Sequence, residues 1–148
     1  LRTTICLPPM TDPHHDAIDN GCFSVTVRVF YEDTDATGVV YHANYLKYLE
    51  RARTMWMESK GATHRELADK QEIAFTVADA NLIFRSPARL DDELNVSVAV
   101  EQSRRARIVL AQSIHCENRL IIKARFTVAC VRLSDFKPCA IPDFLIKE

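Results

Sequence analysis

The chain has 148 residues, of which 47% are hydrophobic and 26% charged, and a formal net charge of −1 at pH 7. This length is typical of a single domain with its own hydrophobic core, and the composition excludes an intrinsically disordered chain. Because 19 basic residues balance 20 acidic ones and no apolar run approaches the ~20 residues of a membrane-spanning helix, we expect neither a nucleic-acid partner nor a transmembrane segment.

The first 21 residues contain three prolines and no apolar periodicity, which predicts a flexible N-terminal extension. Residues 22–148 are expected to form one domain. The extension has no apolar stretch of the kind found in signal peptides. The five cysteines are scattered and include no CxxC motif. We therefore expect free thiols, no metal site and a cytoplasmic protein.

Residues 23–31, FSVTVRVFY, alternate between apolar and polar side chains, as a half-buried strand does. An acidic loop follows, and from Asn44 to Lys60 the apolar period becomes helical. We expect Asn44 to cap this helix and Gly61 to end it. The stripe expected to face the sheet comprises Tyr45, Tyr48, Leu49, Ala52, Met55 and Trp56. A second stripe, on the opposite side and expected to meet another chain or a ligand, comprises Leu46, Glu50, Arg53 and Met57.

The second half of the chain is expected to contain a short helix over 63–70 followed by strands. In IAFTVADANLIFR the apolar phase switches near Asp79, which predicts a bend or bulge. Three further alternating segments are ELNVSVAVEQ, RARIVLAQSIHC and RLIIKARFTVACVRL. The layout is thus α+β, with one long helix against an antiparallel sheet. Because such a sheet leaves long edges exposed, we expect a homodimer or a dimer of dimers.

The loop between strand and helix contains Glu32, Asp33 and Asp35. It is interpreted first as a solvated loop, since acidic residues are frequent in loops and favourable near a helix N-terminus. A calcium site is the second interpretation. The residues that match the start of an EF-hand loop are Asp33, Asp35, Thr37 and Gly38. Position 12 is Asn44 where a Glu is needed, and the preceding segment has a strand period, so we reject the calcium site.

The third interpretation of the loop is catalytic. The strand delivers Asp35 to the loop, Gly38 permits a tight turn, and the helix begins directly afterwards. The first N–H groups of a helix have no internal partner, so they can polarise a carbonyl group and hold the oxyanion formed on attack. A nearby carboxylate can attack the carbonyl carbon or deprotonate a water. The chain has no GxSxG motif or Ser-His-Asp order, so Asp35 is the candidate catalyst.

The segments RVFYEDTDATGVVYHANYLKYLERAR, SPARLDDEL and FTVACVRLSDFKP resemble those of YbgC-type acyl-CoA thioesterases, which have the hotdog fold. The chain is more distantly similar to 4-hydroxybenzoyl-CoA thioesterases. The likeness runs from about Val25 to Pro142, and its core, D-x-x-G-V-V-Y-H-x-x-Y, is a specific signal. It implies a five-stranded antiparallel sheet wrapped around the long helix. It also implies dimers that join their sheets, usually paired into tetramers, with active sites between subunits.

By the same resemblance, Asp35 matches the essential carboxylate and His42 a histidine of the motif. Relatives that act on hydroxybenzoyl substrates carry Tyr at the position of His42. The resemblance therefore gives less support to a substrate with an aromatic acyl group than to acyl-CoA substrates in general. The family often has two glycines where this chain has Thr37 and Gly38, which is expected to narrow the site. The residues expected to position the thioester are Gly38, Tyr41, Asn44 and Tyr45. Those expected to bind CoA are Arg104 and Arg105, which align with phosphate-contacting residues of related thioesterases, and the weaker candidate Arg89.

The expected reaction is hydrolysis of an acyl-CoA thioester without a cofactor. Asp35 acts as nucleophile or general base, and backbone N–H groups around Tyr41 and His42 polarise the carbonyl. The leaving thiol has a pKa near ~8.5, so its thiolate departs without a strong general acid. Glu50 is the alternative carboxylate, because some hotdog thioesterases use one on the central helix. The alternative functions are a hotdog dehydratase and a non-catalytic module that binds acyl-CoA or acyl carrier protein. YbgC-type relatives are associated with lipid metabolism.

Overall fold

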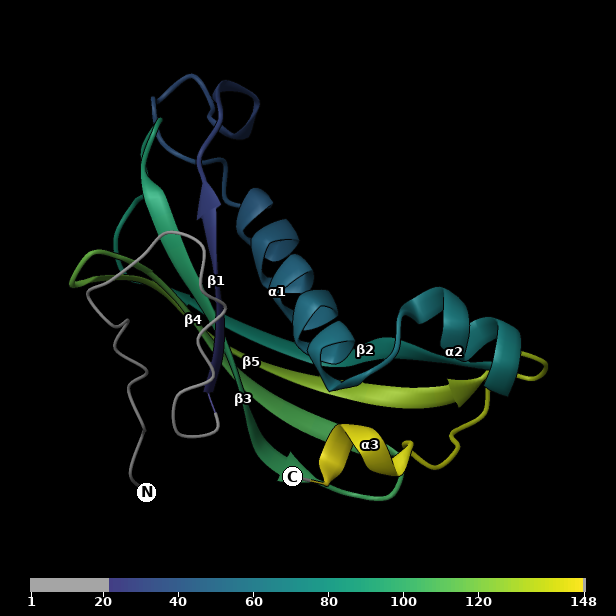
Figure 1. Cartoon of the computed structure of the whole chain (residues 1–148). Coiled ribbons are helices and arrows are strands. Elements are labelled where there is room, and N and C mark those ends of the chain that lie inside the picture. Colours follow the sequence, from purple (N-terminus) through teal and green to yellow (C-terminus); the bar gives the residue numbers. More distant parts are fainter. Residues whose placement is uncertain (1–21, 148) are drawn as a thin grey trace.

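The computed structural model describes residues 22–147, so the extension expected over 1–21 lies outside the described residues. A short 3-10 helix over Tyr31–Asp33, η1, precedes the long helix over Asn44–Lys60, which is labelled α1 in Figure 1. In chain order the elements are β1 (Cys22–Arg28), η1 (Tyr31–Asp33), α1 (Asn44–Lys60), α2 (His64–Gln71), β2 (Ile73–Phe84), β3 (Glu93–Ser103), β4 (Arg107–Cys116), β5 (Arg119–Arg132) and α3 (Asp143–Ile146).

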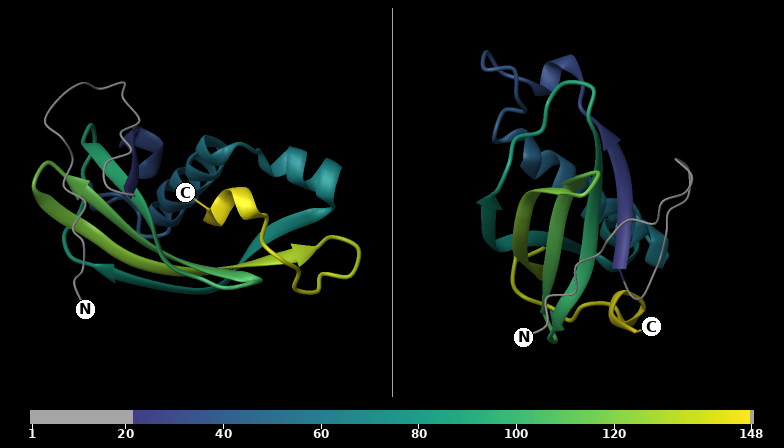
Figure 2. Two further views of the ribbon diagram at one scale, coloured as in Figure 1. Left: turned by 60° about the horizontal axis from the view of Figure 1, so that its bottom comes forward. Right: turned by 90° about the vertical axis from the view of Figure 1, so that its left-hand side faces the viewer.

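The five strands found in residues 22–147 form one sheet in the order β1-β3-β4-β5-β2, and every neighbouring pair is antiparallel. The sheet curves around α1 (Figure 2). The predicted α+β architecture, with a five-stranded antiparallel sheet on one long helix, is therefore confirmed. The bulge predicted near Asp79 is also present, because the register between β2 and β5 shifts between Val77 and Asp79.

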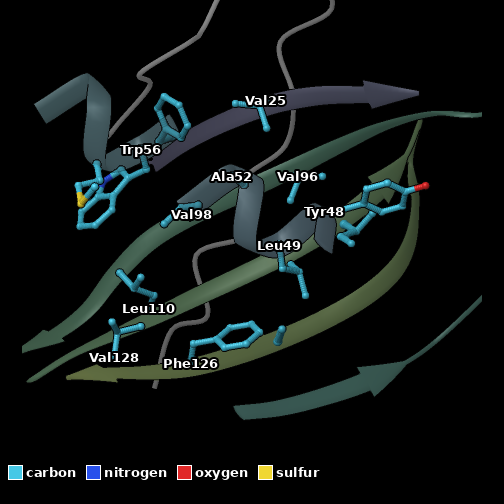
Figure 3. Close-up of a cluster of buried hydrophobic side chains, with 14 of the residues drawn as sticks. Val25, Tyr48, Leu49, Ala52, Trp56, Val96, Val98, Leu110, Phe126 and Val128 are labelled. Carbon is cyan, nitrogen blue, oxygen red and sulfur yellow. The ribbon is translucent and has the colours of Figure 1, made fainter. Parts of the chain in front are cut away.

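The hydrophobic core lies between α1 and the sheet (Figure 3). The predicted sheet-facing stripe of α1 is buried at Tyr45, Tyr48, Leu49, Ala52 and Trp56. The buried strand residues that it faces include Val25, Val96, Val98, Leu110 and Phe126. Strand alternation places these side chains on one face of the sheet, and burial of apolar surface against α1 stabilises the fold.

Two methionines of α1 correct the predicted helix faces. Met55, expected against the sheet, is 41% exposed, whereas Met57, expected on the outward stripe, is 3% exposed. Met57 lines a cavity together with Ile141 and Leu145, from the C-terminal segment and α3. The outward face is therefore covered at this point by the same chain, which the period of α1 alone does not reveal. Leu46, on the same predicted stripe, remains 44% exposed.

The ends of α1 agree with the prediction, but its cap does not. The helix begins at Asn44 and ends at Lys60, and Gly61 follows with a φ of 125° that favours glycine. The N-cap position is occupied by Ala43, so the prediction that Asn44 caps the helix was wrong. Helix α2 begins one residue after the expected start, because Thr63 is its N-cap.

None of the helices in the described part of the chain is long and apolar enough to cross a bilayer. Cys116, Cys130 and Cys139 are free thiols, as predicted. Cys22 is disulfide-bonded, so the expectation of a free thiol was wrong at that position.

Candidate active site

The acidic loop between β1 and α1 is a closed turn. The Asp35 N–H donates to the Val39 carbonyl and the Gly38 N–H donates to the Asp35 carbonyl, both at 3.0 Å. Gly38 has a φ of 81°, and a Cβ atom there would meet nothing within 4 Å. Glycine is therefore favoured at this position by backbone conformation rather than by lack of space. The Val40 N–H donates to the Ala88 carbonyl at 2.9 Å, which ties the loop to the segment after β2.

The Asp35 carboxylate is exposed, and Thr37 fixes its orientation. Its Oδ1 atom accepts from the Thr37 backbone N–H at 2.8 Å and from the Thr37 hydroxyl. These two hydrogen bonds, with a smaller contribution from the positive charge of His42, hold the Asp35 pKa below its ordinary value. The other oxygen, Oδ2, accepts from no group of residues 22–147. Asp35 thus presents one free oxygen of an ionised carboxylate.

Sequence reasoning did not identify Thr37 as a functional residue. Asp side chains commonly accept from the backbone two residues further on, so the Asp-x-Thr spacing is a signal that would have found it. Asp33 was likewise treated only as part of an acidic cluster. Its carboxylate accepts from the Phe30 N–H at 2.8 Å and closes the 3-10 turn η1, so it supports the loop rather than facing the site.

The start of α1 holds the loop through backbone and amide donors. The Asp33 carbonyl oxygen accepts from the Tyr41 N–H and from the Asn44 side-chain amide, both at 2.9 Å. The Asn44 N–H in turn donates to the Tyr41 carbonyl at 2.8 Å. The His42 N–H has no acceptor among the described residues. Of the two N–H groups expected to polarise a carbonyl, that of Tyr41 is therefore occupied and that of His42 is available.

The side chains of Tyr41, His42 and Tyr45 occupy different environments. Tyr41 and His42 are both exposed, and their ring centroids lie 4.5 Å apart. Tyr45 is 3% exposed, and its hydroxyl accepts from the Ala88 N–H at 3.1 Å. Burial is the main cause that raises the Tyr45 pKa, with a smaller opposing effect of the Ala88 hydrogen bond. Tyr45 thus connects α1 to the segment after β2.

The structure separates the three candidate CoA-binding arginines. Arg89 forms a bridge with Val39 and so lies beside the acidic loop. The nearby acidic side chains form ion pairs with other arginines, since Asp91 pairs with Arg28 at 3.0 Å and Asp92 lies 3.8 Å from Arg119. Asp92 contacts Arg89 only through the backbone, because its carboxylate accepts from the Arg89 N–H at 2.8 Å. Within residues 22–147 the Arg89 side chain forms no ion pair.

Arg104 and Arg105 lie in the turn between β3 and β4, at the other end of the sheet. The 11 residues of β3 separate this turn from the end of the strand nearest the acidic loop. At roughly 3.3 Å per residue, that strand spans about 33 Å. Arg104 and Arg105 therefore do not join Asp35 within one chain.

Glu50, the alternative carboxylate, belongs to a separate cluster on α1. The Thr54 hydroxyl donates to Glu50 at 2.6 Å and lies 3.0 Å from Nε2 of His64. All three line the cavity behind Met57, whose volume is about 130 Å³. Glu50 lies six residues beyond Asn44 on the helix, which is about 9 Å further along the helix axis than the residue that begins α1.

No three His, Cys, Asp or Glu side chains in the described part of the chain gather in a way that would hold a metal ion.

Comparisons with known proteins agree with this architecture. Residues 29–148 match the model of the Thioesterase-like superfamily. The chain is 43% identical over 125 residues to the acyl-CoA thioesterase YbgC of Haemophilus influenzae, covering 84% of this chain and 91% of that protein. It is 39% identical over 127 residues to the acyl-CoA thioester hydrolase YbgC of Escherichia coli O157:H7, covering 85% of this chain and 94% of that protein.

Solved structures show the same fold. A 1,4-dihydroxy-2-naphthoyl-CoA thioesterase from Synechocystis superposes with a TM-score of 0.78 at 25% identity, covering 84% of this chain and 92% of that one. The 4-hydroxybenzoyl-CoA thioesterase from Pseudomonas sp. strain CBS-3 gives a TM-score of 0.80 at 19% identity over 85% of this chain and 97% of that one, which speaks for the fold alone. The chain thus belongs to the Thioesterase-like superfamily and, within it, to the family of the YbgC acyl-CoA thioesterases, with the hotdog fold.

Proposed function

We propose that this protein hydrolyses acyl-CoA thioesters to a free acid and CoA, with Asp35 as the catalytic carboxylate and the His42 N–H as the donor to the thioester carbonyl. The observation that carries the proposal is the presence, in one loop, of a free carboxylate oxygen on Asp35 and a free backbone donor on His42. The names of the YbgC relatives support the same reaction.

The chemistry follows from these two groups. The thioester carbonyl oxygen accepts from the His42 N–H, close to the positive end of the α1 dipole. Asp35 Oδ2 then adds to the carbonyl carbon, giving an anhydride that water cleaves, or it removes a proton from an attacking water. Either route expels a thiolate whose conjugate acid has a pKa of about 8.5, so a strong general acid is not required. A low Asp35 pKa keeps the carboxylate ionised at neutral pH.

The phosphates of CoA require cationic partners, and the arginines supply them. Arg89 is the candidate on the same chain as Asp35, whereas Arg104 and Arg105 are proposed to serve the site of a second copy.

The edge strand β2 exposes Val77, Ile83 and Phe84 by 47%, 39% and 54%. Pairing of two copies through this edge would form a homodimer and remove these side chains from water, and two such dimers would form a homotetramer.

A thiol-trapping assay over a panel of acyl-CoA and acyl-carrier-protein thioesters tests the function. We expect thiol release by the unaltered chain and a loss of roughly 10³-fold in kcat for Asp35→Asn, with the circular dichroism spectrum unchanged. Glu32→Gln, which alters an exposed carboxylate of the same loop, is the matched control and should retain full activity.

Other outcomes would replace the proposal. Full turnover by Asp35→Asn would exclude Asp35 as the catalytic group. Alkene formation from a β-hydroxyacyl thioester without thiol release would indicate a dehydratase. Binding of the thioester without either reaction would indicate a non-catalytic module.

A further inference from the structure

The free thiols of Cys130 and Cys139 face each other near the C-terminal end of strand β5. Val131 in β5 forms an antiparallel bridge with Pro138, and the Cys139 N–H donates to the Cys130 carbonyl at 3.0 Å. The segment after β5 therefore turns back along the strand and places Cys139 opposite Cys130. Their Sγ atoms lie 3.5 Å apart.

This separation leaves little movement before a bond can form. A disulfide has an S–S length of about 2.05 Å, so the two sulfur atoms need to approach by roughly 1.5 Å. Directly opposed residues of antiparallel segments also have Cα separations of about 4.5–5.5 Å, within the range that disulfides span. Cys116, the other free thiol of the described residues, lies at the opposite end of β4 and offers no such partner.

The two thiols differ in access, which assigns them different roles. Cys130 is 0% exposed, while Cys139 is partly exposed. Burial raises the Cys130 pKa, and the adjacent Cys139 raises it further, so Cys130 is a poor first nucleophile. Attack by Cys139 on an incoming reagent followed by closure from Cys130 is the order that this arrangement favours.

The pair also lies where the C-terminal segment is attached to the sheet. The Cys130 N–H donates to the Ala106 carbonyl at 2.8 Å, and the Ile141 N–H donates to the Arg105 carbonyl at 2.8 Å. Ile141 and Leu145, both 4% exposed, then line the cavity behind Met57. A covalent bond at Cys139 would fix the start of the segment that closes this cavity.

We propose that Cys130 and Cys139 are an oxidisable dithiol, which small-molecule disulfides convert to an intramolecular disulfide that clamps residues 138–146 onto the sheet. The Cys139 thiolate attacks one sulfur of the small disulfide, forming a mixed disulfide and releasing one thiolate. The Cys130 thiolate then attacks Sγ of Cys139 and releases the second. In total, two protein thiols lose two protons and two electrons, and one small disulfide is reduced to two thiols.

Oxidised glutathione is the probe, applied to the full chain after reduction and removal of the reductant. Peptide mapping by mass spectrometry should find a Cys130–Cys139 linked peptide in the unaltered chain and in Cys116→Ser. Cys130→Ser should instead retain one glutathione on Cys139, because no second thiol displaces it. Cys139→Ser should give neither the link nor an adduct on the buried Cys130. A stable glutathione adduct on Cys139 of the unaltered chain, with Cys130 still a thiol, would overturn the proposal.

A second measurement tests the clamp itself. Hydrogen exchange of peptides covering residues 138–146 should slow in the oxidised form. The rise in Tm on oxidation should be greater in the unaltered chain than in Cys139→Ser treated in the same way, by on the order of 5 °C, because the disulfide of Cys22 can re-form in both. Unchanged exchange in a chain shown to carry the link would refute the conformational effect. Neither readout uses catalytic turnover, so these results are independent of the proposed thioesterase activity.

Discussion

The side-chain amide of Asn44 donates to the carbonyl oxygen of Asp33 at 2.9 Å, so the first residue of α1 holds the acidic loop against the helix that follows. The Tyr41 N–H donates to the same oxygen. These two hydrogen bonds hold the loop against the start of the helix. Asp35 and His42 both belong to the segment that runs from Asp33 to Asn44, which these bonds close.

Asn44→Ala should therefore weaken both the fold and the proposed catalysis. Loss of one hydrogen bond is expected to lower the free energy of unfolding by about 1 kcal/mol, and a displaced loop should lower kcat/KM by about tenfold. Urea denaturation and the thiol-release assay measure the two effects. Asn44→Asp, which keeps the shape but cannot donate, should behave similarly, whereas Glu58→Gln on the exposed face of the same helix should change neither. An active Asn44→Asp would show that the amide donor is dispensable.

Thr37→Val should shift the pH dependence of the proposed reaction. The Thr37 hydroxyl is the main cause of the low Asp35 pKa, so its removal should raise that pKa and move the acid limb of kcat/KM to higher pH. The lowered pKa also favours the folded state above the unfolded-state pKa, and this contribution is lost as the pH falls through the folded-state pKa. Thr34→Val removes a hydroxyl that donates to the Tyr31 carbonyl instead, and its profile should coincide with that of the unaltered chain.

Tyr45→Phe should destabilise the fold without disturbing its packing. The Tyr45 hydroxyl accepts from the Ala88 N–H, and its loss would leave a buried donor without a partner. We expect the free energy of unfolding to fall by about 1–3 kcal/mol in chemical denaturation. Tyr41→Phe removes a hydroxyl from a side chain that is 45% exposed, and it should be neutral. Equal stability of the two variants would contradict the assigned role of Tyr45.

Mixing two inactive variants should restore activity if the site is shared between copies. Asp35→Asn supplies intact arginines, and the double variant Arg104→Ala and Arg105→Ala supplies an intact Asp35. Random association of the two chains should restore roughly a quarter of the activity, because half of the dimers are mixed and each mixed dimer has one complete site. No recovery after co-refolding, with mixed dimers confirmed by native mass spectrometry, would show that Arg104 and Arg105 do not act across the interface.

Phe84→Glu should dissociate the proposed dimer. Phe84 is 54% exposed on the edge strand β2, and a charge there should oppose burial against a second copy. Light scattering should report the mass of one chain for this variant. Thr26→Glu, on an exposed position of the opposite edge strand β1, is the matched control and should leave the assembly intact. Dissociation by Thr26→Glu alone would place the interface at β1.

The sequence by itself determined the elements and their order. The helical period and Gly61 determined the ends of α1, and the alternation that switches phase near Asp79 determined the bulge of β2. These features are local, because side-chain periodicity and backbone preference act within a few residues. The position of Asp35 in the loop that leads into α1 follows from the same local order, which is why the candidate catalytic loop was recognisable.

Only the tertiary structure decided which distant residues meet. It placed Met57 rather than Met55 in the core. It brought Arg89 beside the acidic loop and separated Arg104 and Arg105 from it. It also placed Cys139 opposite Cys130. It also showed that Asn44 does not cap the helix, contrary to the expectation, but donates a hydrogen bond from its side-chain amide to the Asp33 carbonyl. These contacts depend on how the returning C-terminal segment and the strand pairings fold over α1. Periodicity within one element specifies its faces, but not what covers them, because that depends on the packing of segments far apart in the chain.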